Sequence, residues 1–176
     1  ALQLVLGIMS SAVFMTVALV FPRWYMSIFS KDPQVIELGI GYLKYLGWGF
    51  GMHAISYAYI VSLRSIRDSL YPMYVSAIAL IANTVLNYGL IFGNFGLPQL
   101  GVEGAAIATT ISRFIEAGFM IYSVYFGSRF VLRAKLEDFR KIEASFLSRY
   151  FKIALPVIFN EGLWGLGTVM LSVAYA

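Results

Sequence analysis

The chain has 176 residues, of which 60% are hydrophobic and only 12% are charged. Soluble domains carry roughly 25% charged residues, so this composition excludes an ordinary soluble globular protein. Because cysteine is absent, disulfides, thiolate metal sites and thiol nucleophiles are excluded as well. The net charge of +4 does not indicate a nucleic-acid partner, because the basic residues gather between apolar stretches.

Five long apolar stretches follow one another along the chain. A helix needs about 20 apolar residues to cross the hydrocarbon core of a bilayer. In lipid, its backbone polar groups must be satisfied within the segment, which favours helices over strands. We therefore predict an all-α polytopic membrane protein with a bundle of five transmembrane helices. The predicted spans are residues 1–21, 45–63, 70–93, 104–127 and 153–176.

The connecting segments predict the orientation of these helices, because cytoplasmic loops are enriched in Lys and Arg. Segments 64–69 and 128–152 together hold nine basic residues, whereas segments 22–44 and 94–103 hold three. We therefore place 64–69 and 128–152 in the cytoplasm of a multi-pass protein of the cell (inner) membrane. Segment 128–152 also shows an amphipathic helical pattern, which predicts a helix lying on the cytoplasmic leaflet. The uncharged ends at Ala1 and Ala176 predict a piece of a longer protein.

Ionisable side chains inside the spans are costly in lipid and are therefore candidates for function. Arg113 and Glu116 lie three residues apart and share a helix face, which predicts either a structural ion pair or a gate or proton relay. Glu161 has no opposite charge near it in sequence, so it suits Na⁺, H⁺ or a cationic ligand. The alternative interpretation is that Glu161 faces a water-filled region and ionises as an ordinary carboxylate.

Uncharged polar side chains supply further candidates. Asn83 and Asn87 lie four residues apart and share a face, so their amides can either coordinate a cation or bond a neighbouring helix. His53 is surrounded by glycines and is more typical of a structural histidine than of a proton carrier. Gly104, Ala105, Ala106 and Ala108 predict a small face for close helix packing. No HExxH, P-loop or GxSxG motif occurs, so neither an enzyme nor a cofactor is predicted.

Three motifs carry a resemblance to a known family. The run Asn83–Gly93 is followed by a short external loop and the run Gly96–Thr109, and then by the pair Ser112-Arg113. Lys152–Pro156 is similar to the start of a later helix in the same family. Together they resemble the MATE (multidrug and toxic compound extrusion) transporters.

The resemblance implies helices three to seven of a twelve-helix, two-lobe transporter. Residues 1–127 would belong to the N-terminal lobe, 128–152 to a cytoplasmic inter-lobe linker, and 153–176 to the first helix of the C-terminal lobe. Such proteins export cationic amphiphilic drugs or toxic compounds in exchange for Na⁺ or H⁺. The remaining helices of the polypeptide and the lipid bilayer would be the other partners.

The resemblance also assigns residues to sites. Asn83 and Asn87 match a helix-five pair beside the N-lobe cation or proton site, and Thr109 matches a helix-six position near it. Glu161 matches the helix-seven glutamate that one branch uses in its C-lobe cation site. Apart from a coupling Na⁺, no metal is implied.

Two other functions stay open at the level of sequence. A lipid-linked oligosaccharide flippase of the same superfamily would need a strongly cationic cavity, and Arg113 is the one basic residue inside the spans. A non-transporting structural or regulatory subunit would have its buried charges paired, and their mutation would change stability alone.

Overall fold

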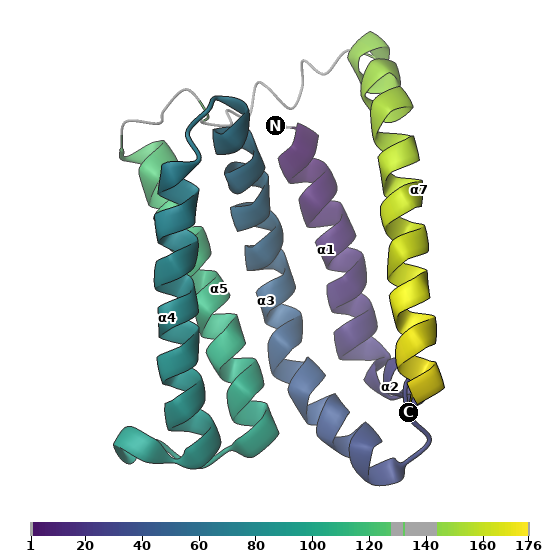
Figure 1. Ribbon diagram of the computed structural model, residues 1–176, viewed down its shortest axis with the longest axis vertical. Helices are drawn as coiled ribbons and strands as arrows, with labels where there is room; N and C mark the ends of the chain where they lie inside the picture. Colours follow the sequence, from purple (N-terminus) through teal and green to yellow (C-terminus); the bar gives the residue numbers. More distant parts are fainter. Residues whose placement is uncertain (1, 128–131, 133–143, 176) are drawn as a thin grey trace.

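The computed structural model describes residues 2–127, 132 and 144–175, and this part of the chain is helical without any strand (Figure 1). The predicted all-α fold is confirmed. The elements in chain order are α1 (Leu2–Val20), α2 (Pro22–Ser27), α3 (Pro33–Ser65), α4 (Leu70–Phe92), the 3₁₀ turn η1 (Asn94–Gly96), α5 (Gly101–Tyr125) and α7 (Ala144–Tyr175).

Local sequence signals explain where the helices begin and end. The Asp32 carboxylate caps α3 by accepting a hydrogen bond from the backbone N–H of Gln34 at 2.8 Å, and Pro33 takes the first helical position. Gly93 ends α4 with φ of 75°, a left-handed conformation that glycine adopts without steric cost.

The segment 22–44, predicted as a connecting loop, is largely helical. It forms α2 and the first turns of α3, and an ion pair between Arg23 and Glu37 joins these two helices. The prediction was wrong because we took the charges of this segment as signs of a loop. The 33 residues of α3 extend about 50 Å, which exceeds the ~30 Å hydrocarbon core, so its charged first turns can lie outside the lipid.

Four helices in the described part of the chain are long and apolar enough to cross a membrane: α1, α4, α5 and the stretch Leu147–Ser172 of α7. The remaining predicted span, 45–63, lies in α3, whose glycines, tyrosines and His53 lower its apolarity. This helix packs between α1 and α5, two helices that are long and apolar enough to cross a membrane, which supports the predicted crossing at 45–63. The protein is thus a multi-pass membrane protein.

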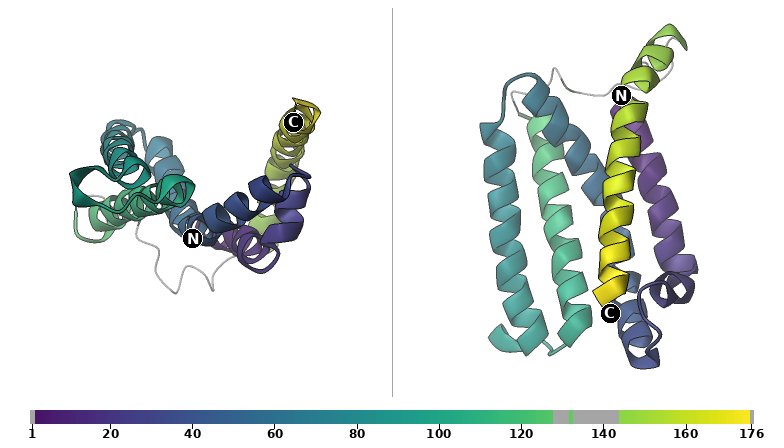
Figure 2. Two further views of the ribbon diagram at one scale, coloured as in Figure 1. Left: turned by 90° about the horizontal axis from the view of Figure 1, so that it is seen from below. Right: turned by 45° about the vertical axis from the view of Figure 1, so that its right-hand side comes forward.

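The helices stand side by side in the order α1, α3, α5, α4 and form an open arc when viewed along their axes (Figure 2). The apolar core lies where α3 ends, α4 begins and α5 ends. It is made of Tyr59, Ile60, Leu63, Val75, Met120 and Val124.

Small residues hold α4 and α5 close together. A Cβ added to Gly104 would lie 2.6 Å from the carbonyl oxygen of Leu90, so only glycine fits there. Ala106 and Ala108 are completely buried on the same helix. The predicted small face is confirmed, and it fixes the distance between the two helices that carry most of the polar side chains described below.

The helix ends alternate between the two ends of the bundle. The α3–α4 turn, the end of α5 and the start of α7 all lie at one end of the bundle, and η1 lies at the other (Figure 1). Most of the predicted amphipathic segment, 128–131 and 133–143, lies outside the described residues. From Ala144 onward the chain is continuous with α7, so the helix begins before the predicted span at 153.

Candidate functional site

A line of hydrogen-bonded polar side chains crosses from α4 to α5. The Asn87 Nδ2 group donates to Asn83 Oδ1 at 3.0 Å, which confirms that the two amides share a face. Asn83 Nδ2 donates in turn to Thr109 Oγ1 of α5 at 3.4 Å. The Thr109 hydroxyl donates to the carbonyl of Ala105 at 2.9 Å. The structure therefore brings together the three residues that the sequence assigned to one site.

One acceptor in this line lacks a partner. Asn87 Oδ1 is buried and accepts no hydrogen bond within the described residues. Leaving a buried polar atom unsatisfied costs roughly 1–3 kcal/mol. An amide oxygen in this state is a ready acceptor for a cation or for a hydrogen-bond donor that comes from outside the bundle.

A second polar cluster lies further along the same helices and centres on Glu116. This side chain is only 5% exposed and forms an ion pair with Arg113, with 3.0 Å between NH1 and Oε2. Ser76 of α4 donates its hydroxyl to Oε1 at 2.8 Å, and Ser56 of α3 lies 3.4 Å from Oε2. Three helices thus contribute hydrogen-bond donors to one buried carboxylate, which is how a charge is tolerated inside a membrane protein.

A cavity of about 350 Å³ joins the two clusters. Asn83 and Thr109 line one part of it, and Arg113 and Glu116 line another. This volume is large enough for several water molecules, and the polar walls supply partners for them. The seam between α4 and α5 can therefore hold water or a small ion along its polar side chains.

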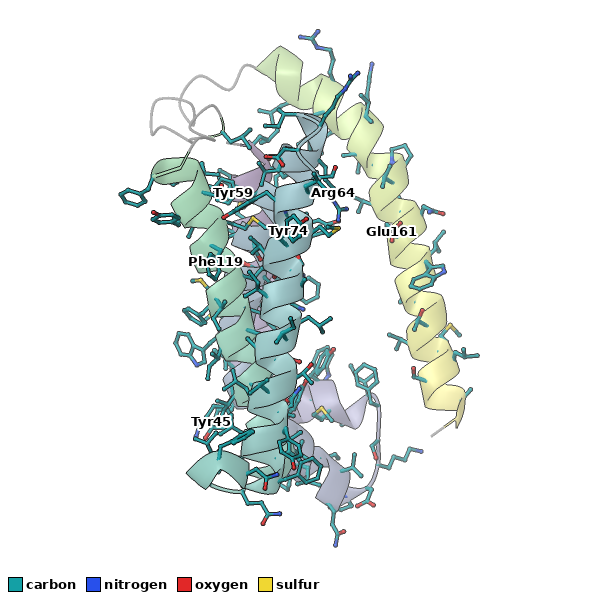
Figure 3. The ribbon with its side chains drawn as sticks, turned by 60° about the vertical axis from the view of Figure 1, so that its left-hand side comes forward. Tyr45, Tyr59, Arg64, Tyr74, Phe119 and Glu161 are labelled. Carbon is teal, nitrogen blue, oxygen red and sulfur yellow. The ribbon has the colours of Figure 1, made fainter. Side chains whose placement is uncertain are left out.

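Glu161 lies apart from both clusters. It is exposed on α7, which packs only lightly against the rest of the bundle in the described part of the chain. Figure 3 shows Glu161 on α7, well separated from Phe119 on α5. The structure does not bring Glu161 together with Asn83, Asn87 or Thr109.

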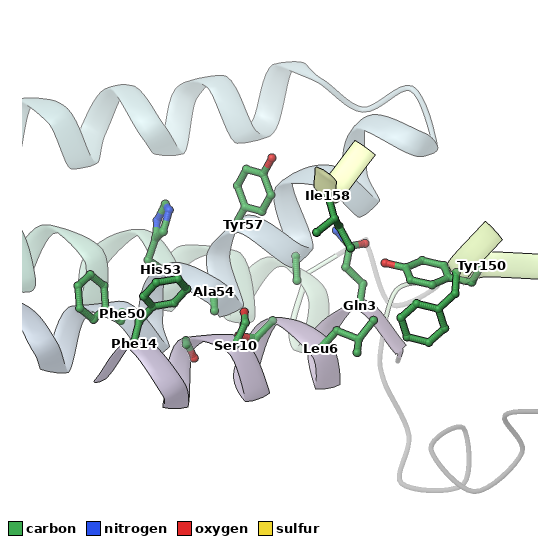
Figure 4. A pocket seen from close by; sticks show the side chains of 14 residues that line it. Gln3, Leu6, Ser10, Phe14, Phe50, His53, Ala54, Tyr57, Tyr150 and Ile158 are labelled. Carbon is green, nitrogen blue, oxygen red and sulfur yellow. The ribbon is translucent and has the colours of Figure 1, made fainter. Parts of the chain in front are cut away.

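A larger cavity of about 690 Å³ lies between α1, α3 and α7 (Figure 4). All three helices contribute aromatic side chains to its wall, among them Phe14 from α1, Phe50 and Tyr57 from α3, and Tyr150 from α7. His53 also lines it, so this histidine faces a cavity and not a packed interior. Aromatic faces with few polar groups suit a flat, apolar or cationic molecule.

Sequence reasoning missed two members of the Glu116 cluster. Ser56 and Ser76 are isolated serines in apolar helices, and their partner lies 60 and 40 residues away in the chain. The available signal was indirect. A buried carboxylate needs several donors, so hydroxyl side chains at matching depth on neighbouring helices were candidates.

Comparison with known proteins places the chain in a family. The MatE family model matches residues 2–89. A probable multidrug resistance protein NorM of Thermotoga maritima is 39% identical over 95 residues, which cover 54% of this chain and 20% of the relative. One from Photorhabdus laumondii is 33% identical over 140 residues, or 80% of this chain and 30% of the relative.

A third relative, the multidrug resistance protein MdtK of Klebsiella pneumoniae, is 30% identical over 144 residues, which cover 74% of this chain and 29% of the relative. No solved structure matches the chain significantly. The chain spans about a third or less of the length of these relatives. The family match, the apolar helices and the motifs along α4 and α5 agree, and the chain belongs to the MatE family.

Proposed function

We propose that this chain is part of a secondary active transporter that exports cationic amphiphilic drugs or toxic compounds in exchange for Na⁺ or H⁺. The observation that carries the proposal is the family match together with relatives named multidrug resistance proteins. Within it, residues 1–127 form part of one lobe, 128–152 a cytoplasmic linker, and 153–176 the start of the second lobe. Segments 64–69 and 128–152 lie on the cytoplasmic side of the inner membrane.

The coupling cation binds at oxygen-bearing side chains in this proposal. Asn87 Oδ1, which is buried and has no partner among the described residues, supplies a neutral oxygen ligand on the α4–α5 seam, as does the Asn83–Thr109 pair. Glu161, which lies apart from these residues, supplies a carboxylate for a separate cation site on α7, in the second lobe. Hard cations such as Na⁺ prefer oxygen ligands, and a site of amide and hydroxyl oxygens needs a carboxylate or water to complete it.

The exported compound is a cation with an apolar body. The aromatic wall of the cavity between α1, α3 and α7 supports this choice, because aromatic faces attract cations and also accept apolar rings. Binding of the coupling cation and of the drug would favour opposite orientations of the two lobes, as in transporters whose central site is exposed to one side at a time.

Ethidium efflux from vesicles containing the full-length protein tests this proposal. Na⁺ and pH gradients are imposed separately on the wild type, on Glu161→Gln, and on Glu103→Gln as a control at an exposed glutamate of α5. We expect efflux to follow one gradient, to be abolished in Glu161→Gln and to persist in Glu103→Gln. Efflux that survives Glu161→Gln would move the cation site to Asn83 and Asn87.

Absence of efflux under either gradient would contradict the exporter. If the protein were a non-transporting subunit, efflux would be absent as well, and the substitutions would change only its stability. Amounts of protein in the membrane are measured for each variant, so that a loss of efflux can be separated from a loss of folded protein.

A further inference from the structure

The polar side chains between α4 and α5 lie in two rows at different depths. Asn83 is bonded to Thr109, and seven residues away on each helix Ser76 is bonded to Glu116. Because α4 and α5 run in opposite directions, these equal spacings place the two rows about 10 Å apart along the helix axes. The row of Asn83 is nearer to η1, and the row of Glu116 is nearer to the α3–α4 turn (Figure 1).

Arg113 lies between these two rows. Four residues separate it from Thr109 on the same face of α5, which places it about 6 Å closer to the α3–α4 turn. On α4, the cavity wall between the rows consists of Ala79 and Leu80. Among the described residues that line this cavity, the Ser112 hydroxyl is therefore the one oxygen ligand that the level of Arg113 offers to a cation.

The Arg113–Glu116 ion pair presents its positive half to the cavity. The Arg113 side chain is 40% exposed, whereas that of Glu116 is 5% exposed. Both carboxylate oxygens are engaged, because Oε1 accepts from Ser76 at 2.8 Å, and Oε2 accepts from Arg113 NH1 at 3.0 Å and lies 3.4 Å from Ser56 Oγ. These contacts stabilise the ionised carboxylate, which in turn holds the guanidinium at its level in the cavity.

The stem of Arg113 is held from the side of α3. A Cβ built on Gly49 of α3 would lie 3.9 Å from Arg113 Cγ, which is ordinary van der Waals contact. Because Gly49 has no side chain, the Arg113 stem can lie close to the α3 backbone. The guanidinium is thus positioned by α3 through its stem and by Glu116 through its charge.

We propose that Arg113 is an electrostatic barrier that closes the cavity between α4 and α5 to cations on the side of the α3–α4 turn. A cation at Asn83 and Thr109 that moved on toward this turn would have to pass the guanidinium, and like charges repel strongly where water is scarce. A fixed arginine in a narrow pore excludes cations and protons for the same reason. Glu116 is a positioning residue that acts through Arg113.

This inference rests on the proposed function, in which the coupling cation binds in the row of Asn83 and Thr109. It adds a reason why that cation is not lost along the two helices without export. With the guanidinium in place, the cation crosses the membrane only when the lobes move.

Passive cation uptake into vesicles that contain the full-length protein, without any drug, tests the barrier. Radioactive Na⁺ and a pH-sensitive dye inside the vesicles follow the two candidate ions. We expect Arg113→Gln to raise the uptake of at least one of them roughly tenfold, as the loss of one unit charge within about 10 Å predicts at an intermediate dielectric constant. Unchanged uptake of both ions would overturn the proposal.

Three further variants show whether the charge of Arg113 is responsible. Arg113→Lys and Glu116→Gln both keep a positive charge at this level, so uptake should stay as low as in the wild type. Arg23→Gln is the matched control, because it removes the arginine of the exposed ion pair with Glu37. Uptake in Glu116→Gln as fast as in Arg113→Gln would mean that the packing of the pair closes the cavity, and would overturn the barrier.

The double variant Arg113→Gln/Glu116→Gln separates the lost barrier from the unpaired carboxylate that Arg113→Gln leaves behind. It lacks both charges, and we expect it to admit cations as Arg113→Gln does. A double variant as tight as the wild type would overturn the proposal. Chloride uptake should stay unchanged in both variants, because removing a positive charge does not help an anion. A parallel rise in chloride uptake would indicate damaged packing and count against the barrier.

Ethidium efflux in the same vesicles separates this inference from the proposed function. A wild type without efflux whose Arg113→Gln variant admits cations would contradict the exporter and keep the barrier. Normal wild-type efflux together with an Arg113→Gln variant that admits no cations would keep the exporter and overturn the barrier. Gel filtration identifies a variant that does not fold, and if this is Arg113→Gln, the double variant provides the comparison.

Discussion

Helices α5 and α7 are both long and apolar, and each carries one glutamate, Glu116 or Glu161, inside its predicted span, yet their surroundings are opposite. In α5, Ala106, Ala108, Met120 and Val124 are completely buried, and Glu116 is bonded from three helices. In α7, none of the residues in its apolar stretch is buried. Hydropathy alone assigns both helices to the membrane, but it does not show which of them is packed against other helices.

The glycines of α5 and α7 differ in their surroundings in the same way. A Cβ on Gly104 of α5 would collide with the backbone of α4, whereas Gly162, Gly165 and Gly167 of α7 have no atoms within 4 Å of such a Cβ. Close backbone approach at small residues is what holds helices together in lipid, where the hydrophobic effect no longer favours their association. The difference teaches that the identity of the facing residues, and not apolarity, defines the packed part of this chain.

Among the substitutions considered, we expect Gly104→Val to disrupt the packing between α4 and α5 most strongly. The added side chain meets Leu90 backbone atoms that cannot move aside, so we expect destabilisation of about 3 kcal/mol, at the upper end for overpacking. Thermal unfolding of the full-length protein in detergent measures it. Gly118→Val is the matched control, because nothing lies within 4 Å of a Cβ at Gly118 on the same helix. Equal losses of stability in the two variants would contradict the close packing of α4 against α5 at Gly104.

The contrast between α5 and α7 is tested by one substitution made in both helices. Met120 is completely buried in α5, and Met170 is 73% exposed in α7. We expect Met120→Ala to cost about 2 kcal/mol, mainly through the cavity and the lost van der Waals contacts. Met170→Ala should change stability by less than about 0.5 kcal/mol, as for other surface positions. A comparable loss in Met170→Ala would show that α7 is packed in the intact protein.

The helical architecture could be predicted from the sequence because about 20 apolar residues have few alternatives in lipid. Residues 22–44 were mispredicted because their charges were taken as signs of a loop, although Pro22 and Pro33 suit the first position of a helix, where the missing N–H costs nothing. Spacing also predicted the local side-chain pairs, Asn83 with Asn87 and Arg113 with Glu116, because residues three or four apart share a helix face.

Contacts between helices far apart in sequence could not be predicted in the same way. The bonds from Ser56 and Ser76 to Glu116 depend on how three helices rotate and slide relative to one another. That geometry is set by small residues such as Gly49 and Gly104, and many positions of the apolar faces would satisfy the same hydropathy pattern. The cavity that joins the two polar clusters follows from this packing and has no signature of its own in the sequence.

The two asparagines of the seam should differ in their contribution to stability. Asn83→Leu removes the hydrogen bonds to Thr109 and Asn87, so we expect a loss of about 1 kcal/mol. Asn87→Leu removes one bond but also an unsatisfied buried oxygen, so the two effects nearly cancel. Thermal unfolding measures both. A loss for Asn87→Leu as large as that for Asn83→Leu would mean that Asn87 Oδ1 has a partner in the intact protein.

The smallest expected difference concerns single hydroxyl groups. The Thr110 hydroxyl of α5 donates to the Tyr45 carbonyl of α3 at 2.9 Å, whereas the Thr168 hydroxyl of α7 donates within its own helix, to Trp164, at 3.0 Å. Side-chain hydrogen bonds between membrane helices contribute about 0.6 kcal/mol on average. Thr110→Val should therefore lower stability by about that amount, and Thr168→Val should leave it unchanged, because no contact between helices is lost. Replicate unfolding measurements of both variants can resolve this difference. A larger loss of stability in Thr168→Val than in Thr110→Val would contradict the inference that α5 is packed more closely than α7.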